Sequence, residues 1–197
     1  MALNRYVSGA VEGIVDDAVL RRMFDEVGLT ALTIYNAGGK QSLRQRIRGF
    51  NLAARYADWV VVADLDHEFP CANEMVQTWL PRRNRRMRLR VAVREIESWL
   101  LSDRERLARF LAVPVSRIPL NPDEEDDPKR LIVDVARRST KRAIREGMVP
   151  RPRSGRSVGT DYTALMIEFA QRWNVRVACQ VSSSLDRTVQ RLGEIGV

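Results

Sequence analysis

The sequence predicts an α/β fold: a Rossmann-like core built on a parallel sheet, followed by a helical, basic C-terminal part. Over the first half of the chain, short apolar segments alternate with amphipathic segments of helical period. The segment WVVVADLD (59–66) is almost entirely apolar up to its end, as expected of a central parallel strand covered on both faces. After Val113 this alternation stops, and proline-rich, acidic and helix-like segments follow.

The elements of the first half follow from hydrophobic spacing and from the glycine and asparagine residues that bound it. Strands are predicted at 4–11, 29–35, 59–66 and 88–95, and helices at 15–28, 41–56 and 96–113. Strands and helices that alternate at this spacing imply βαβ units and a parallel sheet. In the fourth strand, arginines alternate with Leu89, Val91 and Val93, which favours a position near the sheet edge.

The second half begins with a loop, 114–129, that contains four prolines and the acidic run DEEDD. Helices are predicted at 127–147, 163–173 and 184–192, with a basic loop at 149–162. We therefore divide the chain into an α/β core, 1–113, and an extension, 114–197. The extension is expected to pack on the core and not to form a separate domain.

Composition excludes several classes of site. Apolar residues make up 45 % of the 197 residues, enough for a substantial core. The single histidine and two widely separated cysteines make histidine-based catalysis and zinc sites poor candidates, so any acid–base chemistry falls to carboxylates, lysines or tyrosines. No apolar run reaches the ~18 residues of a membrane span, and no signal-peptide pattern is present. A cytoplasmic protein without a membrane partner is expected.

The net charge of +8 is unevenly distributed. Segment 81–94 contains seven arginines and no acid, and segment 137–156 contains eight basic residues against Glu146 alone. Arginine clusters are suited to bidentate contact with phosphate, so nucleic acid, either DNA or RNA, is the expected partner. The alternative is a solvated basic face balanced by acids such as those in 123–127.

Carboxylates follow three of the predicted strands: Glu12 after the first, Asp64 and Asp66 after the third, and Glu95 after the fourth. In an open parallel sheet, ligands bind beyond the carboxyl ends of the strands. Clustered carboxylates repel one another unless a cation joins them, and hard oxygen donors favour Mg²⁺ or Mn²⁺. These four residues are therefore the predicted metal ligands, although any one of them alone would be read as a solvated acid or a helix cap.

Three further acids, Asp16, Asp17 and Glu97, are expected to complement the positive N-terminal ends of the helices that they begin. Lys40 follows Gly38 and Gly39 and is either a catalytic, phosphate-binding lysine or a solvated residue of a glycine turn. The GGK segment lacks the spacing of a P-loop.

The basic loop holds a further candidate for phosphate contact. Arg153 and Arg156 flank a glycine, which would let the backbone approach a phosphate chain closely. The alternative is a plain surface loop.

Two of these segments resemble the marks of the TOPRIM fold: VEG (11–13) after the first strand and DLD (64–66) after the third. Three others, AGGK (37–40), VREIESWLL (93–101) and PRSGRSVG (152–159), resemble small bacterial TOPRIM-like proteins related to OLD-type nucleases. The TOPRIM marks cover about the first 95 residues, and the looser likeness covers most of the chain.

The resemblance implies magnesium-dependent cleavage or transfer at a phosphodiester. Glu12 would correspond to the catalytic glutamate of the fold, and Asp64 and Asp66 to its metal-binding aspartates. The kinship suggests a role in mobile-element or phage defence and leaves open a homodimer or a partner protein. Unlike the large OLD proteins the chain has no ATPase domain, and no active-site tyrosine motif supports topoisomerase chemistry.

Three function classes follow from these observations. The leading one is a Mg²⁺-dependent nuclease or phosphodiester-transfer enzyme acting on nucleic acid. The alternative is a non-catalytic nucleic-acid-binding or adaptor protein that retains the fold. A receiver-like phosphoacceptor is disfavoured, because receivers place an acidic pair after the first strand and a single aspartate after the third, the reverse of this sequence.

Overall fold

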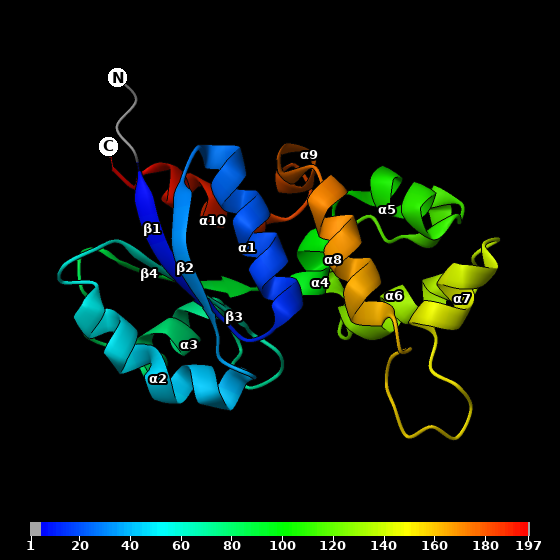
Figure 1. The fold of residues 1–197 in the computed structure, drawn as a ribbon, viewed down its shortest axis with the longest axis horizontal. Helices are drawn as coiled ribbons and strands as arrows, with labels where there is room; N and C mark the ends of the chain where they lie inside the picture. Colours follow the sequence, from blue (N-terminus) through cyan, green and yellow to red (C-terminus); the bar gives the residue numbers. More distant parts are fainter. Residues whose placement is uncertain (1–4, 197) are drawn as a thin grey trace.

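The computed structural model describes residues 5–196 and contains a four-stranded, all-parallel sheet, which confirms the predicted α/β class (Figure 1). The strands are β1 (Tyr6–Val11), β2 (Thr30–Asn36), β3 (Trp59–Asp64) and β4 (Met87–Ala92). They lie in the order β2-β1-β3-β4, so β1 and β3 are central and β4 is an edge strand, as its alternating sequence predicts.

Helices follow each of the first three strands and make up most of the second half. They are α1 (Ile14–Val27), α2 (Lys40–Ala53), α3 (Ala72–Trp79), α4 (Ile96–Leu101), α5 (Arg104–Leu111), α6 (Pro128–Ala136), α7 (Arg142–Met148), α8 (Tyr162–Arg172), α9 (Val175–Cys179) and α10 (Ser183–Gly193). No helix among residues 5–196 is both long enough and apolar enough to cross a membrane.

Both faces of the sheet are covered, because successive side chains of a strand point to opposite faces. On β3, Val61 and Ala63 pack into a cluster with side chains of α2 and α3. Val60 and Val62 belong instead to the larger cluster that contains side chains of α1, α4 and α10. The uninterrupted apolar run of β3 is therefore explained by burial on two sides.

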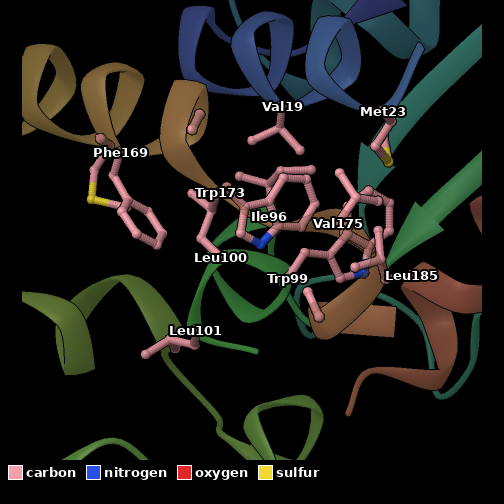
Figure 2. Packing of buried hydrophobic residues seen from close by; sticks show 14 of the residues in the cluster. Val19, Met23, Ile96, Trp99, Leu100, Leu101, Phe169, Trp173, Val175 and Leu185 are labelled. Carbon is pink, nitrogen blue, oxygen red and sulfur yellow. The ribbon is translucent and has the colours of Figure 1, made fainter. Parts of the chain in front are cut away.

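The larger cluster continues from the sheet into the C-terminal part. Figure 2 shows Trp99 of α4 beside Leu185 of α10, with Val19 of α1 in the same cluster. The Trp99 indole nitrogen donates a hydrogen bond to the Ser184 hydroxyl at 2.7 Å. In addition, α8 packs against α1 and α10 against β4. Residues of the extension thus complete the core on this face of the sheet.

Two predicted helices are interrupted. The segment 96–113 forms α4 and α5, separated at Asp103, whose buried carboxylate accepts a hydrogen bond from the Asn174 backbone at 2.8 Å. The segment 127–147 forms α6 and α7, separated near Ser139, whose hydroxyl accepts a hydrogen bond from the Lys141 backbone at 3.1 Å. In both cases a short polar side chain bonds to backbone outside its own helix, and apolar periodicity alone does not reveal this.

Other differences concern short elements and strand ends. Helices α3 and α9 were not predicted, because eight and five residues give too few turns for a clear period. The third and fourth strands end at Asp64 and Ala92, earlier than predicted. Consequently Glu95 is not at a strand tip: it is the residue immediately before α4.

Gly159 provides a test of the packing between α7 and the loop that leads to α8. A Cβ on Gly159 would lie 2.2 Å from the Gly147 carbonyl oxygen, a backbone atom that cannot rotate away. Gly159→Ala should therefore lower the free energy of unfolding by at least about 1–3 kcal/mol in urea titrations. Gly49→Ala, in an exposed turn of α2 with nothing within 4 Å of its Cβ, is the control and should stabilise by about 0.5–1 kcal/mol. Equal effects would contradict the packing.

Candidate functional site

The pairing of β1 with β3 brings Glu12 and Asp64 together. Glu12 follows the last residue of β1, and Asp64 is the last residue of β3. A carboxylate oxygen of Glu12 accepts a hydrogen bond from the Asp64 backbone nitrogen at 2.9 Å. Burial raises the pKa of Glu12, although this hydrogen bond and the Lys40 ammonium act in the opposite direction. The Glu12 side chain is therefore fixed at the carboxyl edge of the sheet.

The Asp64 carboxylate joins β3 to α4. Its Oδ1 accepts a hydrogen bond from the backbone nitrogen of Ile96, the first residue of α4, at 2.9 Å. Burial raises the pKa of Asp64 well above its ordinary value, and the charges of Asp16, Glu97 and Glu12 raise it further. Asp64 is thus crowded by other carboxylates from several elements.

Asp16 and Glu97 belong to this same group of neighbouring carboxylates. Asp16 lies in the first turn of α1, and its carboxylate accepts a hydrogen bond from the Gly13 nitrogen at 2.5 Å, in keeping with the expected helix-terminus role. Burial first, and then the charge of Glu97, raise the pKa of Asp16 to about 7. Both residues were assigned from the sequence only to helix ends. The available signal for Asp16 was its position four residues after Glu12, in the first turn of the helix that follows.

Glu97 is the most enclosed acid of the group, with only 1 % of the residue exposed. Its Oε1 accepts a hydrogen bond from the Tyr162 hydroxyl at 3.1 Å and lies 3.4 Å from the Lys129 ammonium. Its Oε2 is buried and has no hydrogen-bond partner. The only signal in the sequence was an acid within the apolar segment IESWLL, whereas Lys129 and Tyr162 are too distant in sequence to be linked to it.

Glu95 faces α6 and not β3. Its Oε2 accepts a hydrogen bond from the Lys129 backbone nitrogen at 3.0 Å. Burial raises the pKa of Glu95, and the charges of Glu97 and Asp127 act in the same direction. Burial disfavours the charge of Lys129, but the carboxylates of Glu97 and Glu95 outweigh this effect and raise its pKa. Glu97 thus connects the Glu95–Lys129 pair to Asp64.

Asp66 is paired with Lys40. The Lys40 ammonium lies 2.7 Å from Asp66 Oδ2 and donates to the Leu65 carbonyl at 3.2 Å. The lysine is placed by the glycine turn before α2, where Gly38 and Gly39 have φ angles of 75° and 122°, a region that glycine enters readily. The Lys40 side chain is 14 % exposed, so in this arrangement its charge is held within the protein by Asp66.

The predicted ligands have the donor chemistry of a Mg²⁺ site, because all are carboxylates. Burial first, and then the charges of neighbouring carboxylates, raise the pKa values of Glu12, Asp16 and Asp64, and Glu97 Oε2 has no hydrogen-bond partner. Within residues 5–196, however, no three histidine, cysteine, aspartate or glutamate side chains are grouped closely enough to hold a metal ion as they stand. The residue types fit a hard cation. In this structure, however, hydrogen bonds and the ammonium groups of lysines hold the carboxylate side chains in place.

The loop that carries Arg153 and Arg156 lies apart from these carboxylates. It connects α7 to α8 and extends away from the body of the protein (Figure 1). Both arginines are exposed, and Arg153 and Gly155 have φ angles of 63° and 69°. The structure thus brings together Glu12, Asp64, Asp66 and Lys40, places Glu95 beside them through Glu97, and leaves this loop elsewhere.

Comparison of the chain with protein-family models, with curated proteins and with solved structures gives no match. The resemblance to TOPRIM proteins therefore continues to rest on the residues themselves.

The crowding of these carboxylates predicts a pH-dependent stability. In the folded protein Asp16 keeps its proton up to pH ~7, whereas an unfolded chain releases it near the ordinary value of 3.8. The folded state thus binds more protons between these values, so the contribution of Asp16 to stability falls as the pH rises through this window. Asp16→Asn removes the titration and keeps an oxygen for the Gly13 nitrogen.

Relative to wild type, Asp16→Asn should therefore gain on the order of 2 kcal/mol in the free energy of unfolding between pH ~4 and pH ~8. Denaturant titrations at several pH values measure this difference. Asp134→Asn, on the exposed side of α6, reports the effect of losing a surface carboxylate. If the difference in the free energy of unfolding between Asp16→Asn and wild type does not grow with pH, the raised pKa of Asp16 is contradicted.

Proposed function

We propose that this protein is a Mg²⁺-dependent enzyme that cleaves or transfers a phosphodiester of nucleic acid. The observation that carries the proposal is the convergence of Glu12, Asp16, Asp64 and Glu97 from β1, α1, β3 and α4, with negative charge in excess of its compensation. Such a group is costly to the fold, and strongly perturbed carboxylates of this kind cluster at functional sites. The TOPRIM resemblance of VEG and DLD supports the same edge of the sheet.

The roles of the residues follow from their positions. Asp64 and Asp66, together with Glu12, would hold the cation, and Glu95 would serve a second position. A bound Mg²⁺ supplies Lewis-acid stabilisation of the phosphoryl oxygens. Glu12, whose pKa is raised by burial, is suited to move a proton at the reacting centre. Lys40, whose ammonium is paired with Asp66 in this structure, would contact the phosphate.

The second candidate is a nucleic-acid-binding protein that does not cleave. The ion pair between Lys40 and Asp66 favours it, because this pair occupies two of the groups that catalysis would require. In that case the carboxylates would be a structural remnant of the fold, and the basic segments, including Arg153 and Arg156, would supply the binding. Binding would then be strongly salt-dependent, and no metal would produce cleavage.

Glu12→Gln tests the catalytic role. The glutamine keeps an oxygen that can accept from the Asp64 backbone, so the fold should persist while the proton carrier and charge are lost. Cleavage of labelled single- and double-stranded DNA and RNA with Mg²⁺ or Mn²⁺ should fall by roughly 10²–10⁴-fold. Nucleic-acid binding should remain close to wild type.

The matched control is Glu68→Gln, which removes a half-exposed carboxylate 3.7 Å from the Lys40 ammonium. This control should retain most of the activity. A Glu12→Gln protein that cleaves at the wild-type rate would refute the assignment, and a wild type that cleaves nothing under any metal would favour the binding protein.

Metal binding is tested separately by calorimetry and thermal unfolding. Wild type should bind Mg²⁺ or Mn²⁺ and melt at a higher temperature in its presence, because a ligand that binds only the folded state stabilises it. Asp64→Asn keeps an acceptor for the Ile96 nitrogen and should lose most of this affinity. Asp134→Asn should behave as wild type. Equal metal affinity in wild type and Asp64→Asn would exclude this site.

A further inference from the structure

A second charged feature lies along the edge strand β4, between α3 and α10. Two adjoining cavities of about 510 and 500 Å³ share Asn73, Val76, Leu89, Arg90 and Arg191 in their linings. Because they share these walls, they form one elongated depression, which we call the β4 groove. It follows β4 from Met87 and Arg88 at one end to Val91 at the other.

The β4 groove is strongly cationic. Six arginines line it: Arg83, Arg85, Arg88, Arg90, Arg187 and Arg191. Glu194 is the one acid in the two linings among residues 5–196, and it is paired with Arg191 at 2.8 Å. Arg88 is paired with Asp58 at 3.0 Å. Within the described chain the other four arginines form no ion pair; the charge of Glu194 acts on Arg90 and that of Arg187 on Asp123, so the six arginines are compensated only in part.

Arg90 shows the cost of this arrangement. Its guanidinium nitrogen Nε has a weak hydrogen bond to the Thr188 hydroxyl at 3.4 Å. Burial first, and then the charges of Arg191, Arg83 and Arg187, lower the pKa of Arg90 to about 10. Arginines from β4, from the segment before it and from α10 thus repel one another in a partly enclosed space. An anion between them would remove the repulsion and satisfy their N–H donors.

The shape and lining of the groove indicate which anion. It follows at least five residues of β4, which at ~3.3 Å per residue is far longer than a single phosphate group. Its other walls include the amides of Asn73 and Gln190 and the aliphatic side chains of Val76 and Leu89. Among residues 5–196, no aromatic ring on which a base would stack lines it. Guanidinium groups spaced along a groove without a base platform suit a repeated phosphate and not a nucleotide base.

We propose that the β4 groove binds the phosphate backbone of a nucleic-acid strand, independently of its sequence. Val91 lines the groove, and the next residue, Ala92, pairs with Asp64 in the sheet. One end of the groove therefore lies beside the strand ends that carry the carboxylates. The idea that a strand held here is presented to those carboxylates rests on the proposed function, but binding itself requires neither metal nor cleavage.

The test uses the double variant Arg83→Gln/Arg187→Gln, because both side chains are exposed and unpaired and their loss should leave the fold intact. Binding of labelled single-stranded DNA and RNA is followed by fluorescence polarisation in EDTA over a range of salt concentrations. Kd should rise by about tenfold or more, and the slope of log K against log[salt] should flatten by roughly 1.4, since two contacts each contribute ~0.7. Thermal melting confirms folding of each variant.

The matched control is Arg21→Gln/Arg172→Gln, which removes the same charge from exposed helix positions paired with Asp17 and Glu168. Its Kd should stay within about twofold of wild type. Equal weakening in both double variants would show that only net charge matters and would overturn the proposal. So would unchanged binding in the groove variant.

Two further arms separate the remaining possibilities. Competition with AMP at equal phosphate concentration should displace the strand poorly; efficient displacement would assign the groove to a small phosphate ligand and overturn the backbone assignment. Glu12→Gln is measured in the same assay and should bind as wild type. A wild-type protein that binds through the groove but cleaves nothing with any metal would refute the proposed enzyme and leave the groove, whereas a wild type that cleaves while the groove variant binds normally would refute the groove alone.

Discussion

The parallel pairing of β1 with β3 is the constraint on which the rest of the site depends. It sets the ends of two strands side by side, so that the Asp64 backbone donates to Glu12 and the Asp64 carboxylate is left to accept from the start of α4. Each carboxylate is thereby used as a structural acceptor and cannot turn away from its neighbours. Like charges that would normally separate in water are held together by backbone hydrogen bonds, and this is why burial and repulsion raise the pKa of Asp64 so strongly.

Burial and repulsion between like charges also act along β4, where the charges are positive. There burial, and then the charges of neighbouring arginines, lower the pKa of Arg90, and the acids nearby neutralise only part of the charge. A fold that tolerates partly compensated negative charge at one end of its sheet and partly compensated positive charge along one edge is suited to a ligand that carries both metal ions and phosphates. Nucleic acid with its counterions is such a ligand, and this common requirement links the two proposals.

The sequence predicted the strands, their parallel pairing and the edge position of β4, because alternation and uninterrupted apolar runs report local burial directly, but it did not predict the order of the other strands. It also predicted that Glu12 and Asp64 would lie close together, since strand ends meet at one edge. It did not reveal the roles of Glu97, Lys129 and Tyr162, which depend on how α6 and α8 fold back onto α4. Nor did it indicate the Lys40–Asp66 pair, which follows from the conformation of two glycines. Contacts between distant segments leave no periodic spacing of residues in the sequence, so an analysis of hydrophobic patterns does not detect them.

Helix α4 has only six residues, yet it and the residue before it form four hydrogen bonds to four different parts of the chain. Its first nitrogen binds Asp64, Glu97 binds Tyr162, Trp99 binds Ser184, and the preceding Glu95 binds Lys129. The acidic edge of the sheet is therefore built by both halves of the protein at once. A minimal core cut after α5 would lose the partners of three of these side chains and expose the apolar surface around Trp99. In evolution or in protein engineering, the carboxylate site and the helical extension would have to be exchanged as one unit.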